Sequence, residues 1–217
     1  MIGYLQIFAA VCFSVLAFGA FVLGADRGNK IKRVNATVVH FFVMFMTLWY
    51  YLGVWGNFVV VQMDRDDGSF DIPLLHYITA TTIMITFTAL ISYKIKQTSL
   101  NVVWYTFFLV FVDRSMIVSV MLYTKSDRDV WTVVSIVFTV VLIVNTIKNS
   151  EEEDVGNHKF VKTVVVLVVS YIVVYLCVTL MGPLHQDMIP YDAQNSILTV
   201  ADLLVSMLCA LPIIHYG

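Results

Sequence analysis

Three charged side chains lie within the long apolar stretches of this chain, and their chemistry is the hardest to explain as packing. Asp113 and Asp202 are carboxylates, and Arg114 directly follows the first of them. Ionised groups in hydrocarbon cost several kcal/mol, so they are retained mainly where they bind a proton, an ion or a ligand. The last lysine of the chain, Lys162, stands at the start of the sixth stretch. An aldehyde is held as an imine only by a primary amine, so no side chain after Lys162 can bind an aldehyde in this way.

The apolar stretches that carry these residues indicate a membrane protein. Of the 217 residues, 59% are hydrophobic and 13% are charged, whereas a soluble domain carries roughly 25% charge. About 20 apolar residues cross ~30 Å of hydrocarbon as a helix, in which the backbone satisfies its own hydrogen bonds. We therefore predict one seven-helix transmembrane domain over residues 1–217. Its predicted spans are residues 2–24, 34–63, 72–93, 102–124, 130–147, 160–182 and 196–214.

The loops predict the orientation of the chain and exclude several functions. The first, third and fifth loops hold nine lysines and arginines and the other three hold three, which predicts an outer N-terminus and a cytoplasmic C-terminus. We expect the lipid bilayer as a partner and no nucleic acid, because the short loops contain no nucleotide-binding glycine loop. No metal-ligand spacing and no His-Glu-x-x-His or Gly-x-Ser-x-Gly motif occurs, so we predict no enzyme and no metal site.

Four sequence patterns follow one another along the second half of the chain. The fourth span contains Leu109-Val110-x-x-Asp113-x-x-Met116-Ile117, and the fifth opens with Arg128-x-Val130-Trp131-x-x-x-Ser135. The sixth contains Ser170-Tyr171-x-Val173-Val174-Tyr175-Leu176, and Ile189-Pro190 precedes the seventh, which has Asp202 in its middle. In this order the patterns resemble those of the microbial (type 1) rhodopsins. The resemblance implies an all-α seven-transmembrane bundle of microbial-rhodopsin type, with its helices packed around a central pocket.

The same resemblance shows where this chain departs from the family. The family places its retinal lysine four residues after the aspartate of the seventh helix, and that position is Ser206 here. A serine hydroxyl forms no imine, so covalent retinal is excluded at the usual site. His76 aligns with the proton acceptor or primary counterion of the family. No carboxylate occurs between Ile72 and Tyr93, so the proton relay of a pump is missing.

The remaining site residues follow from the alignment and from helix geometry. We expect Asp202 to bond tyrosines such as Tyr51 or Tyr171, or to pair with His76 as a self-neutralising, proton-binding pair. Asp113 is expected to bond Thr81. Arg114 points about 100° away from Asp113, so it either snorkels, pairs within the chain or marks an oligomer contact. The predicted pocket residues are Tyr51, Tyr77, Thr81, Asp113, Met116, Ser135, Tyr171 and Tyr175.

Two functions remain open from the sequence. The first is an opsin homologue without covalent retinal, acting as a sensor or as a ligand-binding or partner-binding protein. It could assemble with copies of itself or with other rhodopsin-like proteins. The second is an ion or proton transporter that uses Asp113, Asp202 and His76 with noncovalent retinal or another stimulus. Noncovalent retinal or another apolar ligand fits either function if the pocket is open, but bulky side chains such as Tyr77 could instead fill it.

Overall fold

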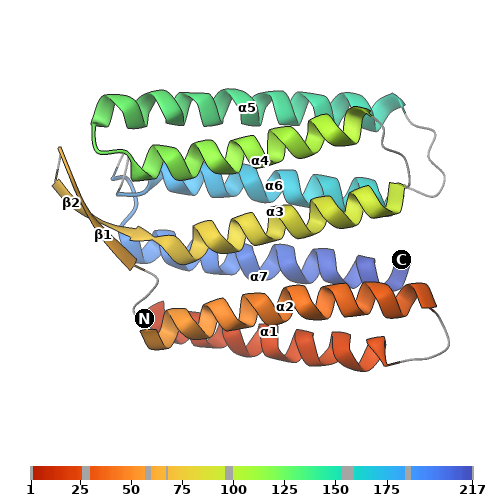
Figure 1. Ribbon diagram of the computed structural model, residues 1–217. Helices are drawn as coiled ribbons and strands as arrows, with labels where there is room; N and C mark the ends of the chain where they lie inside the picture. Colours follow the sequence, from red (N-terminus) through yellow and green to blue (C-terminus); the bar gives the residue numbers. More distant parts are fainter. Residues whose placement is uncertain are drawn as a thin grey trace.

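Seven helices lie side by side in the computed structural model, which describes residues 2–25, 30–56, 60–66, 68–95, 100–152, 159–183 and 187–216. Consecutive helices run in opposite directions, and the two ends of the chain lie at opposite ends of the bundle (Figure 1). This confirms the predicted fold class. The helices are α1 (Ile2–Gly24), α2 (Lys30–Gly56), α3 (Leu74–Ile95), α4 (Leu100–Met121), α5 (Lys125–Glu152), α6 (Lys159–Met181) and α7 (Tyr191–Tyr216).

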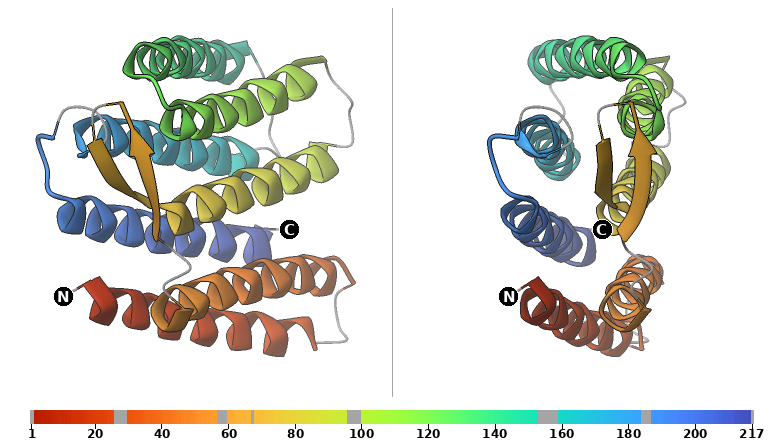
Figure 2. Two further views of the ribbon diagram at one scale, coloured as in Figure 1. Left: turned by 60° about the vertical axis from the view of Figure 1, so that its left-hand side comes forward. Right: turned by 90° about the vertical axis from the view of Figure 1, so that its left-hand side faces the viewer.

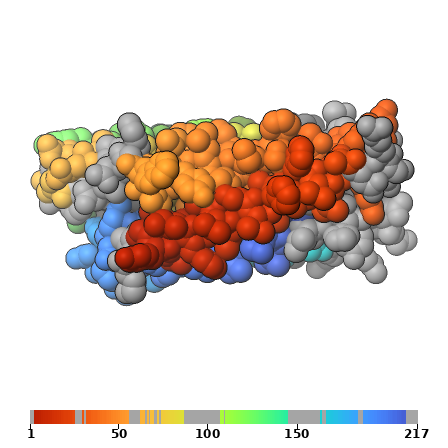
Figure 3. All heavy atoms as spheres, turned by 90° about the horizontal axis from the view of Figure 1, so that it is seen from below, coloured from red at the N-terminus to blue at the C-terminus, as the bar shows by residue number. Residues whose placement is uncertain are grey.

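The helices form a closed arrangement when the bundle is viewed from its end (Figure 2). Helices α1 and α2 pack against each other and against α7, and α3 also contacts α4, α6 and α7. In the space-filling view from below, α1 and α2 lie over the middle of that face, with blue atoms of the C-terminal part of the chain beside α1 (Figure 3). Helix α3 therefore lies where side chains from the fourth, sixth and seventh helices can meet.

Each helix buries one stripe and presents apolar side chains outward. On α2 the buried stripe is Val39, Val43, Met46 and Tyr50, each at most 1% exposed, whereas Phe41 is 68% exposed. Such outward apolar surface is expected where the solvent is lipid. Among the described residues, three helical stretches are long and apolar enough to cross a membrane: Gly3–Gly24, Lys32–Trp55 and Tyr191–Ala210. Together with the fold, this describes an integral membrane protein.

A β-hairpin replaces helix at two predicted span ends. The predicted spans 34–63 and 72–93 are wrong there, because α2 ends at Gly56 and α3 begins at Leu74. Between them, β1 (Val60–Arg65) pairs antiparallel with β2 (Gly68–Pro73). The apolar run that begins β1 continues the hydropathy of α2, but its β-branched valines favour a strand. Across the turn Arg65 pairs with Gly68, whose φ of 136° favours glycine.

The fifth and seventh helices also begin earlier than predicted, at Lys125 and Tyr191 instead of residues 130 and 196. Their first turns are polar, so hydropathy alone misses them. The Thr124 hydroxyl donates to the Asp127 carboxylate at the start of α5, and such side-chain contacts stabilise the first turn of a helix. The polar first turns extend these two helices beyond their apolar stretches.

The tip of the hairpin is fixed to the start of α5. The Lys125 backbone N–H donates to Asp66 Oδ2 at 2.8 Å. Arg128, whose side chain is 2% exposed, places Nη1 3.3 Å from Asp66 Oδ1 and donates to the Tyr123 carbonyl at 2.7 Å. One carboxylate therefore ties the α2–α3 connection to the α4–α5 corner.

This contact predicts a pH dependence of stability. The Lys125 N–H, with help from the Arg128 guanidinium, holds the pKa of Asp66 below its ordinary value of 3.8. A carboxyl group whose pKa is lowered by folding stabilises the folded state above its unfolded pKa, and loses this effect as the pH falls through the lowered pKa. We expect Asp66→Asn to lower the thermal midpoint at about pH 7, and the difference from the wild type to vanish in acid.

The control for this prediction is Asp64→Asn, because Asp64 is an exposed carboxylate in the neighbouring strand. Its thermal midpoint is expected to equal that of the wild type both at about pH 7 and in acid. A difference between Asp66→Asn and the wild type that persists below the titration range of Asp66 would contradict the assignment.

Candidate functional site

Asp202, in the middle of α7, is the acceptor of a buried hydrogen-bond cluster. Its Oδ2 atom accepts from the hydroxyls of Tyr50 and Thr79, each at 2.8 Å. The Tyr171 hydroxyl donates to Oδ1 at 2.5 Å, and His76 Nδ1 lies 3.0 Å from Oδ2. Both Asp202 and His76 are 0% exposed. We call these five residues, from four helices, the Asp202 cluster.

The donors define the chemical form that the cluster favours. An ionised carboxylate accepts about four hydrogen bonds and donates none, which matches the four groups around Asp202. His76 Nδ1 must carry a hydrogen to donate to Asp202, which leaves Nε2 free to take up a proton. His76 Nε2 is buried and has no hydrogen-bond partner among the described residues.

The structure confirms most of the contacts predicted for Asp202 and corrects one. The predicted contacts of Asp202 with His76 and with Tyr171 are both present. The prediction for Tyr51 is wrong, because its side chain is 36% exposed and its neighbour Tyr50, which is 0% exposed, binds Asp202. One residue along a helix rotates a side chain by about 100°, which moves it from the core to the lipid face.

Asp113 lies in a second, smaller polar contact between α3 and α4. Its Oδ2 atom accepts from the Thr81 hydroxyl at 2.9 Å, as predicted, and its side chain is 5% exposed. Arg114 is 56% exposed, and its Nε lies 3.8 Å from the same carboxylate oxygen. This contact agrees with the alternative in which Arg114 pairs within the chain, because its long side chain reaches back toward Asp113.

Tyrosine rings from α3 and α6 contact one another among the predicted pocket residues. Tyr77 and Tyr175 are 4% and 1% exposed, and their ring centroids lie 5.7 Å apart with planes at 85°. Tyr171 also packs against Tyr175, with centroids 6.0 Å apart. Met116, another predicted pocket residue, is 2% exposed. The edge-to-face contact of Tyr77 with Tyr175 is a favourable aromatic geometry, and it joins α3 directly to α6.

Three buried serines complete the site. Ser135, predicted to face the pocket, is 0% exposed and shares a hydrogen bond with Ser115 at 2.7 Å. Ser115 was not predicted, because it stands two residues after Asp113 and therefore lies on another face of the same helix. Ser206, one turn beyond Asp202, is also 0% exposed, and its Oγ has no hydrogen-bond partner among the described residues.

The seven-helix arrangement and its buried aspartate define a class of membrane protein. The fold is that of the microbial rhodopsins, as known structures show over the whole chain. The cyanorhodopsin of Calothrix sp. NIES-2098 is similar with a TM-score of 0.81 and 9% identity, covering 100% of this chain and 95% of that one. Halorhodopsin, a light-driven chloride pump, gives 0.79 and 13%, covering 99% and 94%.

A third similar structure is the light-driven proton pump of Coccomyxa subellipsoidea, with a TM-score of 0.70 and 16% identity, covering 98% of this chain and 92% of that one. Neither a family model nor a curated protein matches the sequence. At these identities the likeness establishes the fold, and the function has to be argued from the side chains of this chain.

Proposed function

We propose that this protein is an opsin homologue that works without covalent retinal, as a membrane sensor whose stimulus acts on the Asp202 cluster. The observation that carries this proposal is the residue one turn beyond Asp202. Ser206 stands where the microbial rhodopsins, by resemblance, keep the lysine that holds retinal, and no lysine follows Lys162. Without an amine at this position the chromophore has no covalent anchor.

The tyrosine packing supports the same proposal. Tyr77 and Tyr175 are pocket residues by resemblance, and here their rings contact each other at 5.7 Å. A flat apolar chain could lie between these two rings only if they separated, and separation would give up their mutual contact. Ser206 and the Tyr77–Tyr175 contact are thus two independent features that do not fit retinal in the family manner.

The His76–Asp202 pair supplies the chemistry of a sensor. In the absence of a protonated imine, His76 is the cation-forming group that faces Asp202. Protonation would place a second N–H on Nε2, in a region where this atom has no partner among the described residues. A buried donor without an acceptor costs about 1–3 kcal/mol, so proton uptake favours a rearrangement of α3 against its neighbours. A membrane protein can report this rearrangement to a partner.

The expected orientation, the expected oligomer contact and the expected lack of an enzymatic role also belong to this proposal. The distribution of lysine and arginine over the loops supports an outer N-terminus. The guanidinium of Arg114, exposed on α4, is the group that we expect at a contact with a second copy or with another rhodopsin-like protein. The expectation of a non-enzymatic role also belongs to this proposal, because the groups around Asp202 are arranged as hydrogen-bond donors to one carboxylate.

The test is the absorption spectrum of the purified protein after addition of all-trans retinal, before and after hydroxylamine. We expect a spectrum identical to that of free retinal, with no red-shifted band. The control is a microbial rhodopsin of established pigment formation, purified and treated in the same way.

A red-shifted, slowly bleaching band would overturn the proposal and favour the second function, ion or proton transport. The buried carboxylates of Asp113 and Asp202 are the observation that favours transport, and two of the similar structures are named as pumps. Light-dependent pH changes in vesicles that disappear in Asp202→Asn would then establish it.

A further inference from the structure

A shallow, open depression of about 660 Å³, called the groove below, lies along the first turns of α5 on the outer surface of the bundle. It is far larger than the space of a single water molecule, about 30 Å³, and it does not include any residue of the Asp202 cluster. Its lining residues all belong to α5: Lys125, Ser126, Asp129, Val130, Val133 and Val134.

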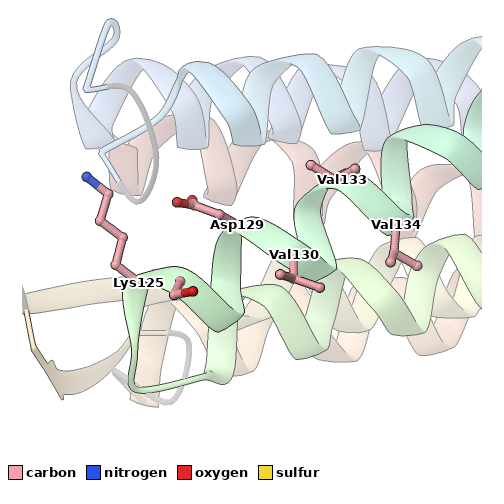
Figure 4. Close-up of a pocket in the computed structure, with 6 residues that line it drawn as sticks. Lys125, Asp129, Val130, Val133 and Val134 are labelled. Atoms are coloured by element: carbon pink, nitrogen blue, oxygen red, sulfur yellow. The ribbon is translucent and has the colours of Figure 1, made fainter.

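The groove changes from charged to apolar along the helix. Lys125 and Asp129 project to the same side of α5, with the valines further along (Figure 4). Val130 and Val133 are each 57% exposed. Because α5 begins at Lys125, its charged turn lies at the membrane edge and the valines extend toward the hydrocarbon. An occupant must therefore have a polar end and an apolar end.

The two charges of the groove are available to an occupant. Among the ion pairs of the described residues, none joins Lys125 to Asp129. They stand four residues apart, so their backbone positions are separated by about 6 Å along the helix, roughly one turn. The matching headgroup has a negative and a positive group joined by a short linker.

We propose that this groove binds a phospholipid with a phosphate and a primary ammonium in its headgroup, as in phosphatidylethanolamine. The phosphate lies against Lys125 Nζ and Ser126 Oγ, and the ammonium donates hydrogen bonds to the Asp129 carboxylate. One acyl chain follows the valines of α5 into the bilayer, where its burial against them is non-directional.

The chemistry of the groove separates this lipid from its common relatives. Phosphatidylcholine carries a trimethylammonium group without N–H, so it cannot donate to Asp129. Phosphatidylglycerol has a phosphate for Lys125 but no cation for Asp129, and its negative charge is repelled by the carboxylate. Charge-assisted hydrogen bonds are roughly twice as strong as neutral ones, so the ammonium with N–H donors is favoured.

The experiment is native mass spectrometry of the full chain released from mixed micelles that contain equimolar phosphatidylethanolamine, phosphatidylcholine and phosphatidylglycerol. We expect retained phosphatidylethanolamine to exceed each of the other two lipids at least about threefold, a difference of roughly 0.6 kcal/mol at RT ≈ 0.59 kcal/mol. Asp129→Asn should abolish the preference over phosphatidylcholine, and Lys125→Gln should lower retention of all three lipids.

The matched control is Asp192→Asn, because Asp192 is an exposed carboxylate in the first turn of α7 and lies outside the groove. It should retain the wild-type preference. Equal retention of the three lipids by the wild type would overturn the proposal. A preference for phosphatidylglycerol, or one that survives in both Asp129→Asn and Lys125→Gln, would overturn it as well. Since Asp129 and Lys125 are exposed, these variants are expected to fold.

Discussion

Asp202→Ala is expected to lower the free energy of unfolding by at least about 3 kcal/mol, more than any other single change in the Asp202 cluster. Four donors would lose their acceptor at once, and three of them, His76, Tyr50 and Thr79, are 0% exposed. Removing one partner of a buried charged pair costs roughly 3–5 kcal/mol. The measurement is unfolding of the purified protein in mixed micelles as the fraction of SDS is raised.

Asp192→Ala is the control for this variant, since it removes an exposed carboxylate from the same helix. Its expected effect is at most about 1 kcal/mol, from the favourable position of an acid at a helix start. If Asp202→Ala and Asp192→Ala unfold at the same fraction of SDS, the Asp202 cluster does not stabilise the bundle.

A second pair of variants measures the effect of one hydrogen bond to Asp202 while the aspartate itself is kept. Tyr50→Phe removes only the hydroxyl that donates to Asp202, and a hydrogen bond to a charged group contributes about 1.5–3 kcal/mol. Tyr51→Phe removes the neighbouring hydroxyl on the outer face, which should change stability by no more than about 0.5 kcal/mol. Equal effects of these two variants would contradict the position of the cluster.

Gly182→Ala is expected to destabilise the protein by about 1–3 kcal/mol, the usual cost of overpacking a filled site. Gly182 follows α6 at the corner that leads to α7. A Cβ atom there would lie only 2.5–2.9 Å from the amide atoms of Gln194, and Gln194 is 0% exposed. The expected loss of stability comes from the close approach of the new methyl group to the Gln194 side chain. We therefore expect Gln194→Ala to rescue the Gly182→Ala variant in part. The measurement is the same SDS unfolding titration.

The matched control is Gly19→Ala in α1, where an added Cβ meets nothing within 4 Å. Alanine is about 0.5–1 kcal/mol more favourable than glycine inside a helix, so this variant should be neutral or slightly more stable. A Gly182→Ala protein as stable as Gly19→Ala would show that the corner accommodates the methyl group.

Hydropathy predicted the bundle because the bilayer leaves a spanning chain few alternatives to helices. It did not predict the hairpin, since the valines that begin β1 are as apolar as those of a helix and only their branching favours a strand. The polar first turn of α5 was missed for the opposite reason. Its start at Lys125 is stabilised by Asp66, which is distant in the sequence.

Part of the site was predictable from the alignment of the helices with a known family and from the spacing of residues on a helix. The position of Asp202 and its contact with His76 followed from the alignment of helices, and geometry confirmed both. Of the two tyrosines expected to bond Asp202, Tyr171 does so and Tyr51 does not. Tyr50 was not expected there, although the buried stripe Val43, Met46 and Tyr50 has the spacing of one helix face. The sequence indicates Arg128 only as part of a motif, because nothing in a sequence shows that a hairpin tip supplies its partner.

The tyrosines in the middle of the bundle have a consequence for how the protein is made. A membrane protein that encloses a pigment is finished only after the pigment has been supplied, and its empty core is a weak point until then. Under the function proposed above, the contact between Tyr77 and Tyr175 is already part of the finished protein, and no pigment has to be supplied. We expect its yield and its lifetime in a cell to be the same whether or not that cell synthesises carotenoid-derived compounds.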